Sequence, residues 1–309
     1  MKTLVAGMGG VGGYFGGVLA QHGADTTFLV KSEHLRRTQS VTLRVQTVDG
    51  NFTLSKPQVV ETLESDICFD VILVCVKYYD LEAVAKIIAP GITPKTVVLT
   101  VQNGIDADRE VLRWLEQVSV YPGSAHIIST LKEPGQVVQS GGPRTLVFGA
   151  RAGGAAPRLE QSVRYLRAHG VQASVSENIE RELWFKFIFA LGFSGLTAVY
   201  DQSFQEIYST PLGKAEFLEV IAQGCDLAGA DGVRFKPSER LKLVERADSH
   251  LLEAAPATSS LQRDLRQGRR SEVEALHGTA LRYARKYGLS LPAIESIYQR
   301  ILARASVPR

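Results

Sequence analysis

The chain has 309 residues, of which 45% are hydrophobic and 22% are charged, and its formal net charge is +3. The length predicts two domains of about 150 residues each, and the composition is that of a globular protein with ample core. So small a net charge argues against nucleic acid or an anionic membrane surface as a partner.

The cysteines indicate a reduced compartment. Cys68, Cys75 and Cys225 are an odd number without CxxC or metal-ligand spacing, so we expect no metal site and a cytoplasmic protein. The first three residues lead straight into a predicted strand, which leaves no room for a signal peptide.

The first half of the chain alternates short β-rich runs with helical segments, which is typical of a parallel sheet with crossover helices. Strands are expected at 2–7, 24–30, 70–76, 96–102, 135–140 and 145–150, and helices at about 11–22 and 157–169. The segment 41–60 is predicted to be a hairpin that turns at Asp49-Gly50. A Gly-Gly-Pro turn is predicted between the last two strands, and a short segment at 171–176 leads out of this part.

Strand signals vanish after residue 176, and helical patterns replace them. Helices are expected at about 178–200, 212–231, 237–254, 271–287 and 292–306. We therefore expect an α/β domain over 1–176, followed by an all-α domain over 177–309.

The stretch GMGGVG, residues 7–12, fits G-x-G-x-x-G directly after a predicted strand and at the start of a helix. Gly7 would make the tight turn, Gly9 would let a pyrophosphate approach the backbone, and Gly12 would permit close helix packing. Gly10 and Val11 complete the loop, where the helix N-terminus offers N–H groups to an anion. This predicts a Rossmann-type dinucleotide-binding domain, and the alternative is a glycine-rich turn without a ligand.

The end of the second strand favours NADPH over NADH. An acid about 20 residues after the loop would bind the ribose 2′-hydroxyl, whereas a cation would favour a 2′-phosphate. Lys31 stands there, 19 residues after Gly12. Arg36 and Arg37 support this interpretation and Glu33 weakens it, and Lys31 could also be an ordinary solvated lysine.

Two polar residues follow buried strands, at the sheet edge where ligands bind in open parallel sheets. Lys77 follows the run at 70–76, and Asn103 lies in the turn QNG. Each could face a bound cofactor, but Lys77 could equally be an exposed strand cap and Asn103 part of a simple turn.

Lys186 is the one cation within an otherwise apolar stretch, in RELWFKFIFALGFSGLTAVY at 181–200. It could flank a membrane segment, snorkel to the surface or act in catalysis. The 14 uncharged residues that follow are too few for a spanning helix, which needs about 20. Ala190 and Ser194 share its helix face and would leave open space beside it.

Glu272 is the candidate partner of Lys186. In RRSEVEALHG, Ser271 and Glu274 are predicted to form a capping box, which leaves Glu272 in the first turn with an inward direction. It could keep Lys186 charged, or it could be a solvated glutamate at a helix start.

Together these residues resemble the ketopantoate reductase (2-dehydropantoate 2-reductase) family, within the wider 6-phosphogluconate-dehydrogenase-like group, over nearly the whole chain. The resemblance rests on GMGGVG, VKYYD at 76–80, QNG, RELWFK, GLTA at 195–198, SSLQRDL at 259–265 and Glu272. It implies that Lys186 is the general acid for reduction of a 2-keto acid and that Glu272 binds a substrate hydroxyl and pairs with Lys186. It also implies that Asn103 and Ser260 hold the substrate.

The resemblance further implies that the glycine loop, Lys31 and Lys77 bind NADPH, and that the all-α half binds substrate and forms the contact of a homodimer. The sequence departs from the family where Asn is usual, at Ala190, Ser194 and Ala257. Three functions remain open: reduction of ketopantoate to (R)-pantoate in pantothenate biosynthesis, reduction of a more apolar 2-keto acid, and NADPH sensing without turnover.

Overall fold

The computed structural model describes residues 1–31, 42–64, 67–151, 153–252 and 255–305. The chain forms two compact units. The first comprises Met1–Gln102 and Asp106–Ile179, and the second Asn103–Ile105 and Glu180–Arg309. The main division thus falls after residue 179, where the sequence suggested 176.

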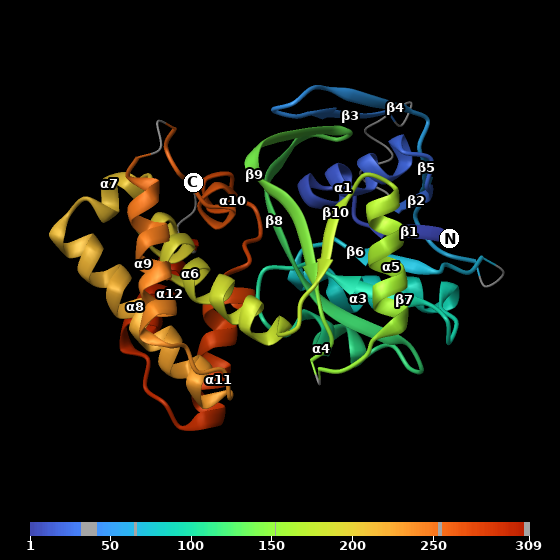
Figure 1. The fold of residues 1–309 in the computed structure, drawn as a ribbon. Helices are drawn as coiled ribbons and strands as arrows, with labels where there is room; N and C mark the ends of the chain where they lie inside the picture. Colours follow the sequence, from blue (N-terminus) through green and yellow to red (C-terminus); the bar gives the residue numbers. More distant parts are fainter. Residues whose placement is uncertain (32–41, 65–66, 152, 253–254, 306–309) are drawn as a thin grey trace. The chain divides into compact units, whose positions relative to one another are not determined.

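The first unit is built on one sheet (Figure 1) with strand order β4-β3-β9-β8-β7-β6-β1-β2-β5, and β10 pairs with β9. The strands are β1 (Lys2–Ala6), β2 (Asp25–Leu29), β3 (Thr42–Gln46), β4 (Phe52–Ser55), β5 (Gln58–Val60), β6 (Val71–Val74), β7 (Val97–Thr100), β8 (Ser119–Glu133), β9 (Gln136–Phe148) and β10 (Gln172–Val175). The run β5-β2-β1-β6-β7-β8 is parallel throughout. In chain order it reads 3-2-1-4-5-6, the order of a Rossmann fold, so the predicted fold class is confirmed.

Both faces of the sheet are buried at the central strands β1, β6 and β7, which explains why these strands are continuous apolar runs. Val5 and Leu73 face one hydrophobic cluster, which helices α1 (Gly10–Gln21) and α5 (Pro157–Ala168) cover. Leu4 and Ile72, one residue earlier in each strand, face the opposite cluster, which α3 (Leu81–Ile88) and α4 (Ala107–Leu112) cover. The period of two in the strands thus builds two cores from one sheet.

The predicted hairpin is correct for β3 and β4, which pair antiparallel on either side of Asp49-Gly50. The remainder of 41–60 forms β5, which pairs in parallel with β2.

The predicted Gly-Gly-Pro turn is wrong. β9 runs through it without interruption, opposite the long strand β8, which the sequence analysis did not predict. His126 pairs with Thr145 and Ile128 with Gly141, so the intervening residues of β9 outnumber those of β8. Gly142 has φ +80° and accommodates the irregularity. Gly142, Pro143 and Arg144, which lie between the paired Gly141 and Thr145, are therefore a bulge within one strand.

The second unit is helical (Figure 1). Its helices are α6 (Ile179–Tyr200), α7 (Phe204–Tyr208), α8 (Pro211–Ala230), α9 (Pro237–His250), α10 (Ser260–Arg266), a π-helical turn η3 (Glu274–Gly278), α11 (Thr279–Tyr287) and α12 (Pro292–Ala305). The five predicted helices are present, and the short helices α7 and α10 are additional. The all-α prediction for this half is confirmed.

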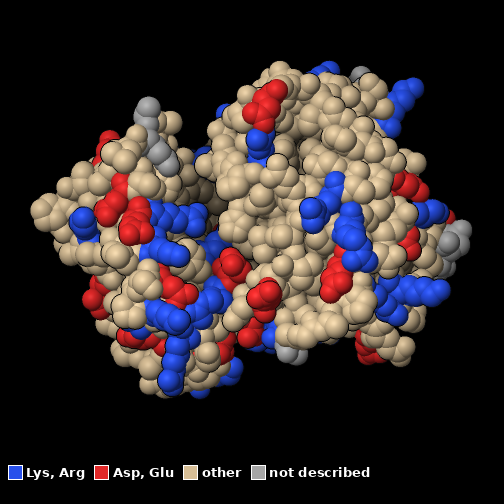
Figure 2. Space-filling view, viewed as in Figure 1, with Lys and Arg blue, Asp and Glu red and all other residues tan. Residues whose placement is uncertain are grey.

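Helix α6 is the core of this unit. A Cβ on Gly192 would lie 2.7 Å from the ring of Phe217, and one on Gly195 would lie 2.6 Å from His277. These glycines therefore let α8 and η3 approach the α6 backbone. By length and composition alone α6 could cross a membrane, but 67% of its most apolar window is buried inside the protein, as in the core helix of a soluble protein. Figure 2 shows acidic and basic side chains interspersed on this face of both units, in keeping with the small net charge.

Candidate active site

The glycine loop has the backbone that a pyrophosphate site requires. Gly7 adopts φ +102°, a conformation that other residues rarely adopt. A Cβ on Gly12 would lie 1.9 Å from the Gly7 carbonyl oxygen, and one on Gly10 would lie 2.7 Å from the Ser129 carbonyl oxygen. At Gly9 nothing lies within 4 Å of that position, so this side is open. The first N–H groups of α1 have no partner within the helix, and an anion could reach them there.

Gln102 is a residue that sequence reasoning missed. Its side-chain amide donates to the carbonyl oxygens of Val74 and Val76, at 2.8 and 3.0 Å, which joins the carboxyl ends of β6 and β7. Its Oε1 is buried and accepts no hydrogen bond from the described residues. Burying an acceptor without a donor is costly, and an N–H group of a bound ligand would satisfy it.

Val11 and Lys77 are both half-buried, and Lys77 directly precedes the short helix η1 (Tyr78–Asp80).

Lys31 follows β2, as expected, but its ammonium forms an ion pair with Asp80. It lies 2.8 and 2.9 Å from the two carboxylate oxygens of Asp80. The Lys31 side chain is 71% exposed and that of Asp80 is 19% exposed. The sequence analysis did not anticipate this acid, because 49 residues separate the partners. Glu33, Arg36 and Arg37 lie outside the described residues.

Lys186 lies on α6 and is half-buried. Burial, the largest cause, and the positive charge of Arg246 lower the pKa of its ammonium, the negative charge of Glu272 raises it, and the net result is a pKa of about 8. The structure therefore brings the two predicted catalytic residues within electrostatic reach of one another. An amine with a pKa of about 8 can both hold and release a proton near neutral pH.

Glu272 is buried, with 8% of its surface exposed, and lies just before η3. The predicted capping box is wrong: the π-helical turn begins without a side-chain cap. Glu274 instead accepts a hydrogen bond from the Tyr298 hydroxyl and lies 3.8 Å from Arg282. A π-helical turn inserts a residue into a helix and is frequent at functional sites.

The predicted substrate residues lie in the second unit. Ala190 is half-buried and Ser194 is buried, both on α6, and Ser260 is the half-buried first residue of α10. Asn103 is half-buried in the short segment that groups with this unit.

The neighbours of two predicted positions have structural roles. Ser259 caps α10 by accepting from the Gln262 N–H at 3.0 Å, and its hydroxyl lies 2.8 Å from that of Thr197. Ala257 stands where the family usually has Asn. Its N–H donates to the Gln205 side chain at 2.8 Å, so here the backbone alone makes the polar contact.

Arg246, on α9, is a second residue that sequence reasoning missed. Its guanidinium carbon lies 4.3 Å from the centroid of the Phe189 ring, and desolvation by the surrounding protein lowers the pKa of the guanidinium. Within the part of the chain that the structure describes, no Asp or Glu forms an ion pair with it. Nothing in the sequence distinguished Arg246 from an ordinary surface arginine, because α9 is rich in charged residues, as is typical of a solvent-exposed helix.

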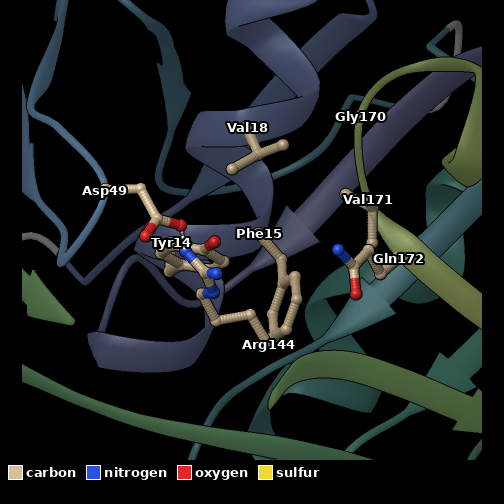
Figure 3. A pocket seen from close by; sticks show the side chains of 8 residues that line it. All are labelled: Tyr14, Phe15, Val18, Asp49, Arg144, Gly170, Val171 and Gln172. Carbon is tan, nitrogen blue, oxygen red and sulfur yellow. Dashed lines mark hydrogen bonds and ion pairs between the residues drawn. The ribbon is translucent and has the colours of Figure 1, made fainter. Parts of the chain in front are cut away.

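A pocket of about 150 Å³ lies elsewhere in the first unit, beside α1 (Figure 3). Its polar groups satisfy one another: Arg144 pairs with Asp49 and hydrogen-bonds Tyr14. It therefore offers no uncommitted charge to a ligand. Among the described residues, no group of three or more His, Cys, Asp or Glu is placed to hold a metal ion.

A Rossmann sheet with its glycine loop, followed by a helical unit that carries a lysine of lowered pKa, defines a two-domain NAD(P)H-dependent oxidoreductase. The chain matches the family model described as ketopantoate reductase PanE/ApbA over residues 3–153, and that of the PanE/ApbA C terminal over 178–305. It therefore belongs to the ketopantoate reductase family.

Individual relatives agree with this assignment. The 2-dehydropantoate 2-reductase of Halobacterium salinarum is 30% identical, covering 96% of each chain. A dimeric ketopantoate reductase from Staphylococcus aureus is similar in structure, with a TM-score of 0.83 and 21% identity over 99% of each chain. D-mandelate dehydrogenase, solved with NADH and anilino(oxo)acetate, has a TM-score of 0.90 and 21% identity over 99% of this chain and 98% of its own. The shared fold thus serves relatives whose names specify different substrates.

Proposed function

We propose that this protein reduces a 2-keto acid with NADPH, and that 2-dehydropantoate, reduced to (R)-pantoate in pantothenate biosynthesis, is the first candidate substrate. The observation that carries this proposal is Lys186: its pKa of about 8, with Glu272 within electrostatic reach, suits a proton donor near neutral pH. An NADPH sensor would need neither residue.

The first unit fits the cofactor. The open side of the loop at Gly9 and the N–H groups of Gly10, Val11 and Gly12 would hold the pyrophosphate. Lys31 would bind the 2′-phosphate, Lys77 would also contact the cofactor, and the unsatisfied Gln102 Oε1 would accept from a carboxamide N–H. When bound, a nicotinamide cofactor supplies the hydride to the 2-keto carbon.

The helical unit would supply the proton. The Lys186 Nζ would donate it to the carbonyl oxygen as negative charge develops there, and the ammonium would stabilise that charge beforehand. Glu272 would keep Lys186 protonated and bind a hydroxyl of the substrate. Asn103 and Ser260 would hold the carboxylate side.

A second candidate is a 2-keto acid with a more apolar side chain. Ala190 and Ala257 replace amides that relatives usually carry, and Ser194 replaces a third with a shorter group. Removing a buried hydrogen-bonding partner costs about 1–3 kcal/mol, so these changes would weaken selection of a polar side chain. We further propose a cytoplasmic enzyme, in keeping with its free cysteines, and a homodimer, as named for the Staphylococcus aureus relative.

The test is a panel of 2-keto acids assayed for oxidation of NADPH and of NADH. The panel includes 2-dehydropantoate and acids with aliphatic or aryl side chains. A clear preference for 2-dehydropantoate supports the first candidate, and a higher kcat/KM for an apolar acid supports the second. If the folded protein binds NADPH but reduces no member, the proposal is refuted and the sensing function replaces it.

A further inference from the structure

We propose that Arg246 binds the carboxylate of the 2-keto acid, alongside Asn103 and Ser260, in a pocket that lacks the amides usual in the family. This inference rests on the proposed function, because it assigns a substrate group to the site around Lys186. It names a residue on α9, a helix to which neither the sequence nor the resemblance assigned any site residue.

The placement follows from two helix faces in contact. Lys186, Phe189 and Phe193 are at i, i+3 and i+7 of α6 and share a face. Arg246 and His250 are at i and i+4 of α9, and the His250 ring lies 5.9 Å from that of Phe189 and 5.3 Å from that of Phe193, between centroids. With the Arg246 guanidinium 4.3 Å above Phe189, the cation lies one helical turn along α6 from Lys186.

The guanidinium is available for a ligand. Other arginines of this unit are committed: Arg181 to Glu239, Arg266 to Asp201 and Arg300 to Glu216. No described carboxylate pairs with Arg246, whose side chain is exposed. The cation–π contact with the ring of Phe189 helps to hold the guanidinium in position. The fork of guanidinium N–H groups matches the two oxygens of a carboxylate.

The charges that act on Lys186 suit an anionic ligand. Arg246 is positive and lowers the pKa of Lys186, so an anion bound at Arg246 would oppose that effect as Glu272 does. A 2-keto acid has one carboxylate next to the carbonyl that Lys186 would protonate, so one small group of atoms would face both cations. A contact between Arg246 and the carboxylate would position the 2-keto acid end of the substrate and would not depend on the chemistry of the substrate's side chain. Loss of the amides at positions 190, 194 and 257 is then compatible with tight binding.

The experiment compares Arg246→Gln and Arg246→Lys with the wild type. The control is Arg240→Gln, which removes the same charge from the same helix at an exposed arginine 3.8 Å from Asp226. Each protein is assayed with the best 2-keto acid of the panel and with the methyl ester of that acid, which keeps the reacting carbonyl but lacks the charge. Binding of anilino(oxo)acetate to the enzyme–cofactor complex is measured in parallel by calorimetry. Thermal unfolding verifies that each variant is folded.

Loss of one charge-assisted contact should raise KM for the acid by about 10- to 100-fold in Arg246→Gln. KM for the ester should change less than about threefold, and Arg246→Lys should recover part of the loss because it retains the charge. Arg240→Gln should behave as the wild type. An equal change for acid and ester, or no change, overturns the inference while leaving the reductase function intact. If the wild type reduces no 2-keto acid, the proposed function fails, and equal binding of anilino(oxo)acetate by wild type and Arg246→Gln then overturns the inference as well.

Discussion

The proton on Lys186 can be followed through the pH dependence of the reaction. Burial and the charge of Arg246, partly opposed by Glu272, bring the pKa of the ammonium from 10.5 to about 8. If the protonated form is the general acid, kcat/KM, which reports the free enzyme, is level below pH of about 8 and falls about tenfold per pH unit above it. At about pH 9 roughly one tenth of the enzyme would remain active. A lysine in water would show no such fall until a pH above about 10.

The neighbouring charges give the sign of two shifts. Glu272→Gln removes the negative charge that raises the pKa of Lys186, so the fall should move to lower pH. Arg246→Gln removes a positive charge that lowers this pKa, so the fall should move to higher pH. Lys186→Met should reduce kcat by about 10²-fold or more and remove the fall, while NADPH binding is retained. Lys242→Met, at an exposed lysine of α9, is the matched control and should leave the profile unchanged.

The measurement is the steady-state rate of NADPH oxidation at 2-keto acid concentrations well below and well above KM, from about pH 6 to pH 11. Solvent deuterium tests whether the titrating proton moves in the same step. Single-turnover rates exclude product release as the source of the profile. A fall centred near the pKa of a free lysine, or one that stays in place in both charge variants, would refute the assignment of Lys186 as the proton donor.

Three further outcomes are expected. Asp80→Asn frees Lys31 for a 2′-phosphate and should raise the ratio of kcat/KM for NADPH to that for NADH, whereas Lys31→Ala should lower this ratio. If the ratio is unchanged in both variants, Lys31 and Asp80 do not distinguish the two cofactors. Gly12→Ala places a Cβ 1.9 Å from the Gly7 carbonyl oxygen, so calorimetry should detect no cofactor binding even where the protein folds. His277 is buried, and burial lowers its pKa to about 4, so the unfolded chain binds a proton first as pH falls. Stability should therefore decrease below about pH 6.5, by up to about 3 kcal/mol, and in urea titrations His277→Gln should decrease less steeply.

The sequence predicted those parts of the fold in which local pattern and tertiary structure agree. The central strands are apolar on both faces and the helices have clear breaks, so the two-part architecture followed from periodicity alone. Strand β8 was missed because SVYPGSAHIISTLKE mixes polar residues with Pro122 and Gly123. The bulge of β9 at residues 142–144 was wrongly predicted as a turn because it contains Gly142 and Pro143. Only the facing strand distinguishes a bulge from a turn, and no local signal reports that strand.

The site divides in a similar way. Lys186 and Glu272 were predicted as site residues because motifs of the family surround them. Asp80, Gln102 and Arg246 were missed because each acts through a partner distant in sequence: Lys31, the end of β6, and the ring of Phe189. Residue type and local position do not identify any of the three as a site residue, because charged or amide side chains are common at strand ends and on amphipathic helices. Their roles arise from tertiary packing.

The same three charges link the rate of reduction to the binding of substrate. Burial of Lys186 makes its proton available near neutral pH, Arg246 strengthens that effect, and Glu272 limits it. A bound carboxylate on Arg246 would neutralise the charge that lowers the pKa of Lys186. That pKa would then rise, so the ammonium would stay protonated in the complex up to a higher pH than in the free enzyme. The fall in kcat, which reports the complex, should therefore lie at a higher pH than the fall in kcat/KM, which reports the free enzyme. With the uncharged methyl ester the two should coincide.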